Sequence, residues 1–381
     1  MRRSAPARVA RATAATPSVP ANPFDHLLRP ELAELSSYVP QALPPGAVRL
    51  DANEAPPLLS EAARAALARA MMPENPSRYP DACALELRQA IAAGCGAEVD
   101  EVLVGVGSDE IIALLLTALD RPRPRLPATS VLTPSPTFVM YRLSARARGL
   151  KMVEVPLDAA WDLELGAMRR AVELMRPNVV FVATPNNPTG NLVSLDRLQA
   201  LVEAASDALV VIDEAYIDYA PRDQMALLRR FPNVAVLRTL SKIGLAALRI
   251  GWLIGPAALV REVDKVRQPY NVCVPAQRGA VFALRELRAE IDAGLARVRE
   301  ERARVRAELL ALGHDVPESH ANFLWVGTPR PAADVHAALA ERGVLVRSFH
   351  AAGGRLANRL RITIGLPAEN DRLLEAVRAC G

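Results

Sequence analysis

Residues 179–190 read VVFVATPNNPTG, and this stretch decides the fold class. Its first five residues form a continuous apolar run rather than an alternating one. Such a run is typical of a strand in a parallel sheet that helices cover on both faces. The Asn, Pro and Gly residues that follow are turn residues. The stretch therefore predicts a buried strand with a loop at its carboxyl end.

Two more runs repeat this pattern, ALVVID at 208–213 and NVAVLRT at 233–239. Between the first two strands, SLDRLQALVEAA at 194–205 has the period of a helix, with Ser194 as the expected N-cap. Strands that alternate with helices predict an α/β protein with a mostly parallel sheet. Ligands gather at the carboxyl ends of such strands. The three runs thus deliver Asn187, then Asp213 with Tyr216, then Lys242 to one edge.

The last third of the chain changes character. Residues 276–313 are rich in Ala, Arg, Glu and Leu and predict one or two long amphipathic helices. The short strands NFLWVG, GVLVRSF and RLRITIG are expected after them. We therefore predict an extension and arm over 1–45, a large cofactor-binding domain over 46–275 and a smaller α+β domain over 276–381. The first 20 residues are expected to be disordered; an organellar transit peptide is the alternative.

Composition excludes several function classes. The net charge is only +4, with 42 acidic residues among the basic ones, and aromatic residues make up 4%, so nucleic-acid binding has little support. No uncharged apolar stretch is long enough to span a membrane. The four cysteines form no CxxC pair, and no histidine stands at metal-ligand spacing. We expect no metal, reduced thiols and a cytoplasmic protein.

Lys242 is one of only three lysines among 46 basic residues. An ammonium group can lose its proton when buried and then act as a nucleophile, whereas a guanidinium cannot. A neutral lysine amine forms a Schiff base with an aldehyde, for which pyridoxal phosphate is the best-known partner. That cofactor needs a carboxylate for its ring nitrogen and donors for its phenolic oxygen. Asp213 would be the carboxylate, and Tyr216 and Asn187 the donors.

A phosphate site has its own candidates. GVGSDEIIALLLTAL at 105–119 is a glycine-containing turn that opens a helix, so Ser108 and Asp109 stand where backbone N–H groups attract an anion. Ser241 and Arg249 would complete this site, and Phe138 would stack on the cofactor ring. Each feature alone also fits a turn, a surface charge or a core residue. Their conjunction at three successive strand ends favours a cofactor site.

The chain resembles the class I/II aminotransferases of the fold type I pyridoxal-phosphate superfamily, and most closely the histidinol-phosphate aminotransferases. The likeness covers nearly the whole chain from about residue 36 and runs through SYVP, LDANEAP, RYPD, GVGSDE, SPTFVMYR, PNNPTG, IDEAYIDY, RTLSKIGLAALRIG, PYNV, ANFLWV, GVLVRSF and LRITIG. PNNPTG, IDEAY and the segment from Ser241 to Arg249 carry the superfamily likeness. RYPD, GSDE and TLSKIGLA are similar to the histidinol-phosphate branch.

The resemblance implies a role for each matching position. Lys242 would be the Schiff-base lysine and the base that moves a proton, and Asp213 would pair with the pyridinium nitrogen. The phosphate would be surrounded by Ser108, Asp109, Thr239, Ser241 and Arg249. Tyr79 would contact the cofactor phosphate bound in the neighbouring subunit, which implies a homodimer. Arg347, Arg361 and Asn53 would contact the substrate.

The leading hypothesis is transamination of L-histidinol phosphate with 2-oxoglutarate in histidine biosynthesis. Transamination of an aromatic or other amino acid, and decarboxylation of threonine phosphate by a related enzyme, stay open as alternatives. Arg347 and Arg361 would serve a phosphate or a carboxylate equally well. A protein that keeps the fold without catalysis is a further alternative, and the filled chemical positions argue against it.

Overall fold

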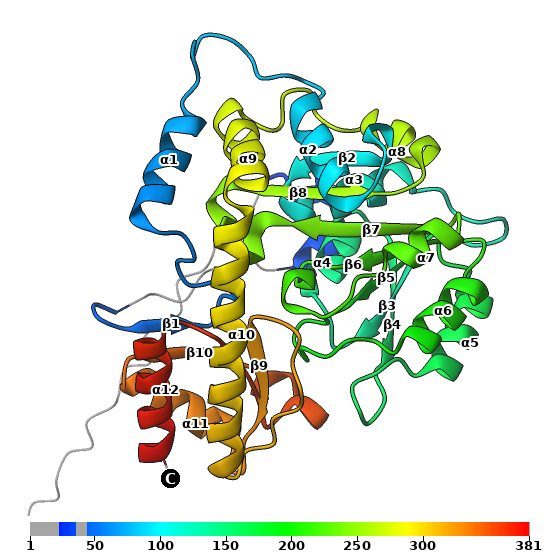
Figure 1. Ribbon diagram of the computed structural model, residues 1–381. Coiled ribbons are helices and arrows are strands. Elements are labelled where there is room, and N and C mark those ends of the chain that lie inside the picture. The colour runs from blue at the N-terminus through cyan, green and yellow to red at the C-terminus, as the bar shows by residue number, and fades with distance from the viewer. Residues whose placement is uncertain (1–22, 36–43, 381) are drawn as a thin grey trace, which may run out of the picture.

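The computed structural model describes residues 23–35 and 44–380 (Figure 1). The extension over residues 1–20 that is expected to be disordered and the SYVP motif at 37–40 lie outside the described residues. Two sheets with flanking helices make up the structure, a seven-stranded one and a four-stranded one. In the described ranges, none of the helices combines the length and the apolar character that crossing a membrane requires.

The seven-stranded sheet has the order β2-β8-β7-β6-β5-β3-β4. Its β8 pairs antiparallel with β2 and with β7, while the other neighbours are parallel. The mostly parallel sheet and the three strands predicted after residue 178 are therefore confirmed. The strands are β2 (Val102–Val106), β3 (Ser130–Ser135), β4 (Lys151–Pro156), β5 (Val179–Ala183), β6 (Leu209–Asp213), β7 (Val234–Thr239) and β8 (Ile250–Ile254).

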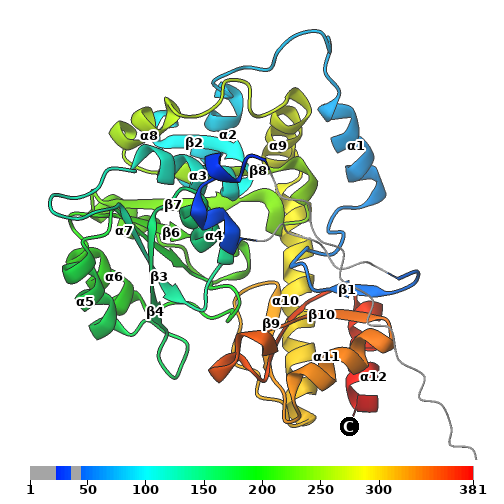
Figure 2. The same ribbon diagram turned by 180° about the vertical axis from the view of Figure 1, so that it is seen from behind.

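Helices cover both faces of this sheet, which explains the continuous apolar runs. One core lies between the sheet and α3 (Gly107–Ala118), α4 (Val139–Ala147) and α8 (Ala257–Asp264) (Figure 2). The opposite core includes α5 (Leu165–Met175), α6 (Leu195–Ala204) and α7 (Met225–Arg230). Within β5, Phe181 belongs to the first core, whereas Val180 and Val182 belong to the second. Both sets of alternating side chains are thus buried.

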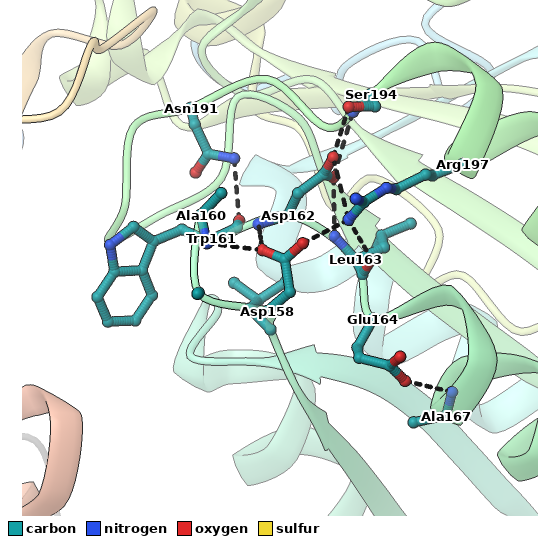
Figure 3. Close-up of polar contacts among 12 residues, drawn as sticks. Asp158, Ala160, Trp161, Asp162, Leu163, Glu164, Ala167, Asn191, Ser194 and Arg197 are labelled. Carbon is teal, nitrogen blue, oxygen red and sulfur yellow. Dashed lines mark hydrogen bonds and ion pairs between the residues drawn. The ribbon is translucent and has the colours of Figure 1, made fainter.

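The helix predicted between the first two strands is α6, but its expected cap is formed differently. Ser194 occupies the N-cap position without a side-chain cap bond to the helix. Its hydroxyl donates instead to Oδ2 of Asp162, which also lies 3.5 Å from Nη1 of Arg197 (Figure 3). Ser194 is therefore the N-cap residue as predicted, and its hydroxyl bonds the Asp162 carboxylate, a strong acceptor, rather than the helix backbone.

The smaller sheet has the order β1-β10-β11-β9. Its last three strands are those predicted from the C-terminal sequence: β9 (Phe323–Gly327), β10 (Val344–Ser348) and β11 (Arg359–Thr363). The fourth, β1 (Val48–Leu50), pairs parallel with β10. It lies in the segment 46–275 that we expect to form the large domain, and three residues are too few to show a strand pattern. Helices α11 (Ala332–Glu341) and α12 (Pro367–Cys380) also belong to this part of the chain.

The predicted helical segment is two helices, α9 (Val274–Glu286) and α10 (Arg288–Ala311). Helix α9 packs against α1 (Glu61–Met71) and α2 (Leu85–Cys95). Helix α10 then runs down beside β9 toward the smaller sheet (Figure 1). This pair links the two sheets, and the domain boundaries at residues 45 and 275 stay a prediction.

Candidate functional site

The carboxyl ends of β5, β6 and β7 carry the three residues that the sequence placed at one edge. Asp213 ends β6 and is buried, Asn187 lies in the loop after β5, and Lys242 closes the short 3-10 helix η5 (Leu240–Lys242) after β7. The Lys242 amine lies 5.7 Å from the centroid of the Tyr216 ring. Lys242 is half-buried rather than buried, and Gly244, two residues later, is exposed.

Two donors hold the Asp213 carboxylate. The Tyr141 hydroxyl donates to Oδ2 over 2.5 Å, and the N–H of Ala215 donates to Oδ1 over 3.0 Å. Burial raises the pKa of Asp213 to about 6, while the Tyr141 bond, the Ala215 bond and the charge of Lys242 oppose the rise. Sequence reasoning missed Tyr141. Its signal was its place three residues after Phe138, in the SPTFVMY segment that already held a predicted aromatic contact.

Tyr216 is held by Asn53. The Asn53 amide donates to the Tyr216 hydroxyl over 2.9 Å. Asn53 is itself fixed, because its N–H donates to Thr363 Oγ1 over 3.1 Å and its carbonyl accepts from Asn322 over 3.1 Å. The Tyr216 ring also meets Phe323 edge-on at 5.2 Å between centroids. The structure thus gives Asn53 a contact with Tyr216, and its contact with substrate stays a prediction. Thr363 and Asn322 carry no signal in the sequence.

A cradle for an anion lies at the start of α3. Gly107 opens this helix with φ +76°, and a Cβ added to it would lie 2.5 Å from Nη2 of Arg249. The same Nη2 lies 3.5 Å from Oδ2 of Asp109. The first N–H groups of a helix have no partner within the helix, and its dipole attracts negative charge. The guanidinium therefore lies beside a set of amides that suits a phosphate.

Thr239 and Ser241 extend this cradle from the end of β7. The Thr239 hydroxyl donates to the carbonyl of Ile250 over 2.9 Å and lies 3.0 Å from the Ser241 hydroxyl. Arg249 Nη1 is 3.4 Å from the same Ser241 hydroxyl. The predicted phosphate residues Ser108, Asp109, Thr239, Ser241 and Arg249 therefore come from two segments that adjoin through β8.

The two predicted aromatic contacts lie in different surroundings. Phe138 immediately precedes α4, is partly buried, and meets Tyr141 edge-on at 5.6 Å between centroids. Tyr79 is 80% exposed and stacks on Tyr270 at 4.6 Å between centroids. Phe138 is thus linked to Asp213 through Tyr141, whereas Tyr79 lies on the surface.

Two arginines lie side by side on the smaller sheet, and one of them contacts the loop after β5. Arg347 on β10 and Arg361 on β11 are direct register partners, so both side chains project from the same face. Arg361 donates from Nη1 to Oδ1 of Asn187 and from Nη2 to the carbonyl of Asp51, each over 2.7 Å. Arg347 is exposed. The pair is suited to gripping a small anion.

The set of groups fits a flat aromatic ring that carries an aldehyde and a phosphate. A buried carboxylate can pair with a protonated ring nitrogen, and a lysine amine can react with the aldehyde. The cradle that a Cβ at Gly107 would fill suits the phosphate.

Comparison with known proteins agrees with this geometry. The aminotransferase class I and II family matches residues 45–377. A histidinol-phosphate aminotransferase of Methylibium petroleiphilum is 43% identical over 87% of this chain and 89% of its own length. Histidinol-phosphate aminotransferase 1 of Burkholderia lata is 43% identical over 93% of this chain and 98% of its own. The crystal structure of histidinol-phosphate aminotransferase from Sinorhizobium meliloti in complex with pyridoxal-5'-phosphate has a TM-score of 0.80 at 24% identity, over 92% of this chain and 98% of that one. The chain belongs to the aminotransferase class I and II family.

Proposed function

We propose that the protein is a pyridoxal-phosphate-dependent transaminase. It converts L-histidinol phosphate and 2-oxoglutarate to imidazole acetol phosphate and L-glutamate, a step of histidine biosynthesis. The observation that carries the proposal is the placement of Lys242, buried Asp213 and Asn187 at adjoining strand ends, with Arg361 bonded to Asn187. The two relatives at 43% identity support the choice of substrate.

The chain would hold the cofactor at four places besides its aldehyde. When bound, pyridoxal phosphate supplies an aldehyde and a ring that withdraws electrons from the substrate Cα. Asp213 would pair with the ring nitrogen, Tyr216 and the Asn187 amide would donate to the phenolic oxygen, and Phe138 would stack on the ring. The cradle formed by Ser108, Asp109, Thr239, Ser241 and Arg249 would hold the phosphate.

Lys242 is the catalytic residue of this proposal. Its amine would hold the cofactor through the aldehyde group, and as a free amine it would act as the base for the proton on the substrate Cα. The distance of 5.7 Å between this amine and the Tyr216 ring centroid supports a shared site for the two groups. Tyr216 is itself held by Asn53.

Arg361 and Arg347 bind the anionic end of each substrate. A guanidinium presents two parallel N–H donors, which match a phosphate or a carboxylate. The Asn187 and Asp51 bonds fix the direction of Arg361. The phosphate of histidinol phosphate and the carboxylate of glutamate would occupy this position in turn, with Asn53 as a further substrate contact.

We also propose a cytoplasmic homodimer with shared active sites. Tyr79 and Tyr270 form a stacked pair whose members are 80% and 43% exposed. Exposed aromatic side chains of this kind are enriched at interfaces between subunits. In the dimer, Tyr79 would reach the phosphate of the neighbouring subunit.

Steady-state assays with histidinol phosphate, phenylalanine and threonine phosphate test the substrate. Turnover of histidinol phosphate with 2-oxoglutarate is expected to be the fastest, and its absence would refute the assignment in favour of whichever compound reacts.

The lysine variants test the mechanism. Lys242→Ala should lose transamination and the covalent attachment of cofactor that borohydride fixes. Lys265→Ala is the matched control, because Lys265 pairs with Glu262 on the surface, and it should keep both. Transamination by Lys242→Ala at the parent rate would refute the mechanism.

A further inference from the structure

A tyrosine beneath the site has no role among those assigned so far. Tyr141 lies in the first turn of α4 and is completely buried. Its hydroxyl makes the 2.5 Å hydrogen bond to Oδ2 of Asp213. The other carboxylate oxygen of Asp213 accepts from the N–H of Ala215. Each oxygen of Asp213 is therefore held by one donor and keeps accepting capacity for a further partner.

The ring of Tyr141 is fixed by two neighbouring aromatic rings. It stacks on Phe181 of β5 with centroids 4.6 Å apart and an interplanar angle of 3°. Phe138 meets it edge-on. Both arrangements are favourable for aromatic pairs, and together they leave the ring little freedom. The direction of the hydroxyl toward Asp213 is thus set by packing from α4 and β5.

The hydroxyl of Tyr141 acts as a permanent donor. Burial and the nearby Asp213 carboxylate raise the pKa of Tyr141 well above its ordinary value, so the phenol keeps its proton. A hydrogen bond donated to a carboxylate favours the ionised form of that carboxylate. Burial alone would drive Asp213 toward its neutral form, and the bond from Tyr141 is the largest opposing influence on its pKa.

The other charged and titratable groups around Asp213 cannot replace this bond. Lys242 favours the ionised carboxylate by charge alone, and Asp109 opposes it. The Tyr216 hydroxyl accepts a bond from Asn53, and its own proton is assigned to the phenolic oxygen of the cofactor rather than to Asp213. We propose that Tyr141 is a positioning residue that keeps Asp213 ionised and directed at the ring nitrogen of pyridoxal phosphate. This inference rests on the proposed function, because it assumes that this cofactor pairs with Asp213.

The test is the affinity for pyridoxal phosphate as a function of pH. Tyr141→Phe keeps the stacked ring and removes only the hydroxyl. The dissociation constant, measured by fluorescence titration between pH 5 and 9, should rise roughly tenfold at pH 6, as expected for a lost hydrogen bond to a charged group. It should approach the parent value at pH 9, where Asp213 is ionised in both proteins. The pH midpoint of binding should therefore move upward by about one unit.

Thr133→Val is the matched control. Thr133 is equally buried and loses one hydroxyl bond, to the carbonyl of Phe181, without touching Asp213. Its pH midpoint should equal that of the parent. If both variants weaken binding by the same factor at every pH, Tyr141 is only a packing residue and the inference is wrong.

A second substitution strengthens the donor instead of removing it. Difluorotyrosine placed at position 141 keeps the ring and makes the phenol more acidic, so the pH midpoint of binding should move downward. An unchanged midpoint would overturn the inference even if Tyr141→Phe failed to fold. If the parent protein binds no pyridoxal phosphate at all, the proposed function fails and this inference fails with it.

Discussion

Replacing Gly251 with alanine is expected to displace the start of α3 and so to weaken the proposed phosphate site, although Gly251 itself is not among the proposed ligand contacts. Gly251 lies on β8 opposite Gly105 of β2, and a Cβ added to it would overlap the carbonyl carbon of Gly107 and the nitrogen of Ser108. These are backbone atoms of the first turn of α3, so no side-chain rotation relieves the overlap. The helix and the strand must separate by about 1 Å before carbon atoms reach ordinary contact.

The expected magnitude has two parts. Overpacking of a well-packed interior costs about 1–3 kcal/mol, and a clash between backbones belongs at the upper end, so the free energy of unfolding should fall by about 3 kcal/mol. Moving the first turn of α3 also moves the N–H groups proposed to bind phosphate. Losing one hydrogen bond to a charged group is worth about 1.5–3 kcal/mol, which corresponds to roughly 10- to 150-fold weaker binding of pyridoxal phosphate.

Urea unfolding and cofactor titration measure the two parts separately. The matched control is Gly255→Ala, where an added Cβ would meet the Ala235 side chain at 3.3 Å, a contact that a small shift relieves. We expect this control to keep cofactor affinity within about twofold, because its nearest neighbours are side-chain atoms rather than backbone atoms of the first turn of α3. If Gly251→Ala matched the control in both assays, close contact between β8 and the start of α3 would not determine the phosphate site.

Tyr216→Phe should lower kcat roughly tenfold, because it removes the hydroxyl proposed to donate to the phenolic oxygen. It should also lower the free energy of unfolding by about 1–3 kcal/mol, because it leaves the buried Asn53 amide without its acceptor. Steady-state kinetics and urea unfolding measure the two effects. Glu214→Gln should become more stable relative to the parent as pH rises from 4.5 toward 7. Burial raises the pKa of Glu214 to about 7, so the folded parent binds more protons than the unfolded chain in this window and loses stability as pH rises. Urea unfolding at several pH values measures the difference, and an unchanged difference would contradict this reasoning. Arg355→Met should raise KM roughly three- to tenfold and leave cofactor affinity unchanged. It removes two bonds to backbone carbonyls and the contact with Trp161, whose ring centroid lies 4.1 Å from the guanidinium carbon. A KM equal to that of the parent would refute this role.

Local pattern was sufficient to predict the central strands. The runs that contain β5, β6 and β7 are buried on both faces, so their composition alone distinguishes them from alternating strands. The positions of the residues after each run could then be predicted as well, because the carboxyl ends of parallel strands lie at one edge of the sheet. This is why Asn187, Asp213 and Lys242 could be placed together without any knowledge of pairing.

Pairing between distant segments was not predictable in the same way. Strand β8 returns antiparallel between β2 and β7, and the three residues of β1 join β10 across almost 300 positions of sequence. Neither choice follows from periodicity, because the hydrophobic pattern of a strand does not specify which distant strand it pairs with. Asn53 illustrates the consequence, since its bond to Tyr216 exists only because the segment after β1 reaches the larger sheet.

The two sheets are joined by polar contacts at two places. Arg361 of the smaller sheet bonds Asn187, at the carboxyl end of the larger sheet. Arg355, between β10 and β11, bonds the carbonyls of Leu157 and Asp158, in the loop after β4. The orientation of the substrate-binding arginines Arg347 and Arg361 relative to the cofactor residues therefore depends on how the two sheets pack against each other. Substitutions in the second contact should change substrate affinity, whereas substitutions around Asp213 and α3 should change cofactor affinity, because the two groups of residues belong to different sheets.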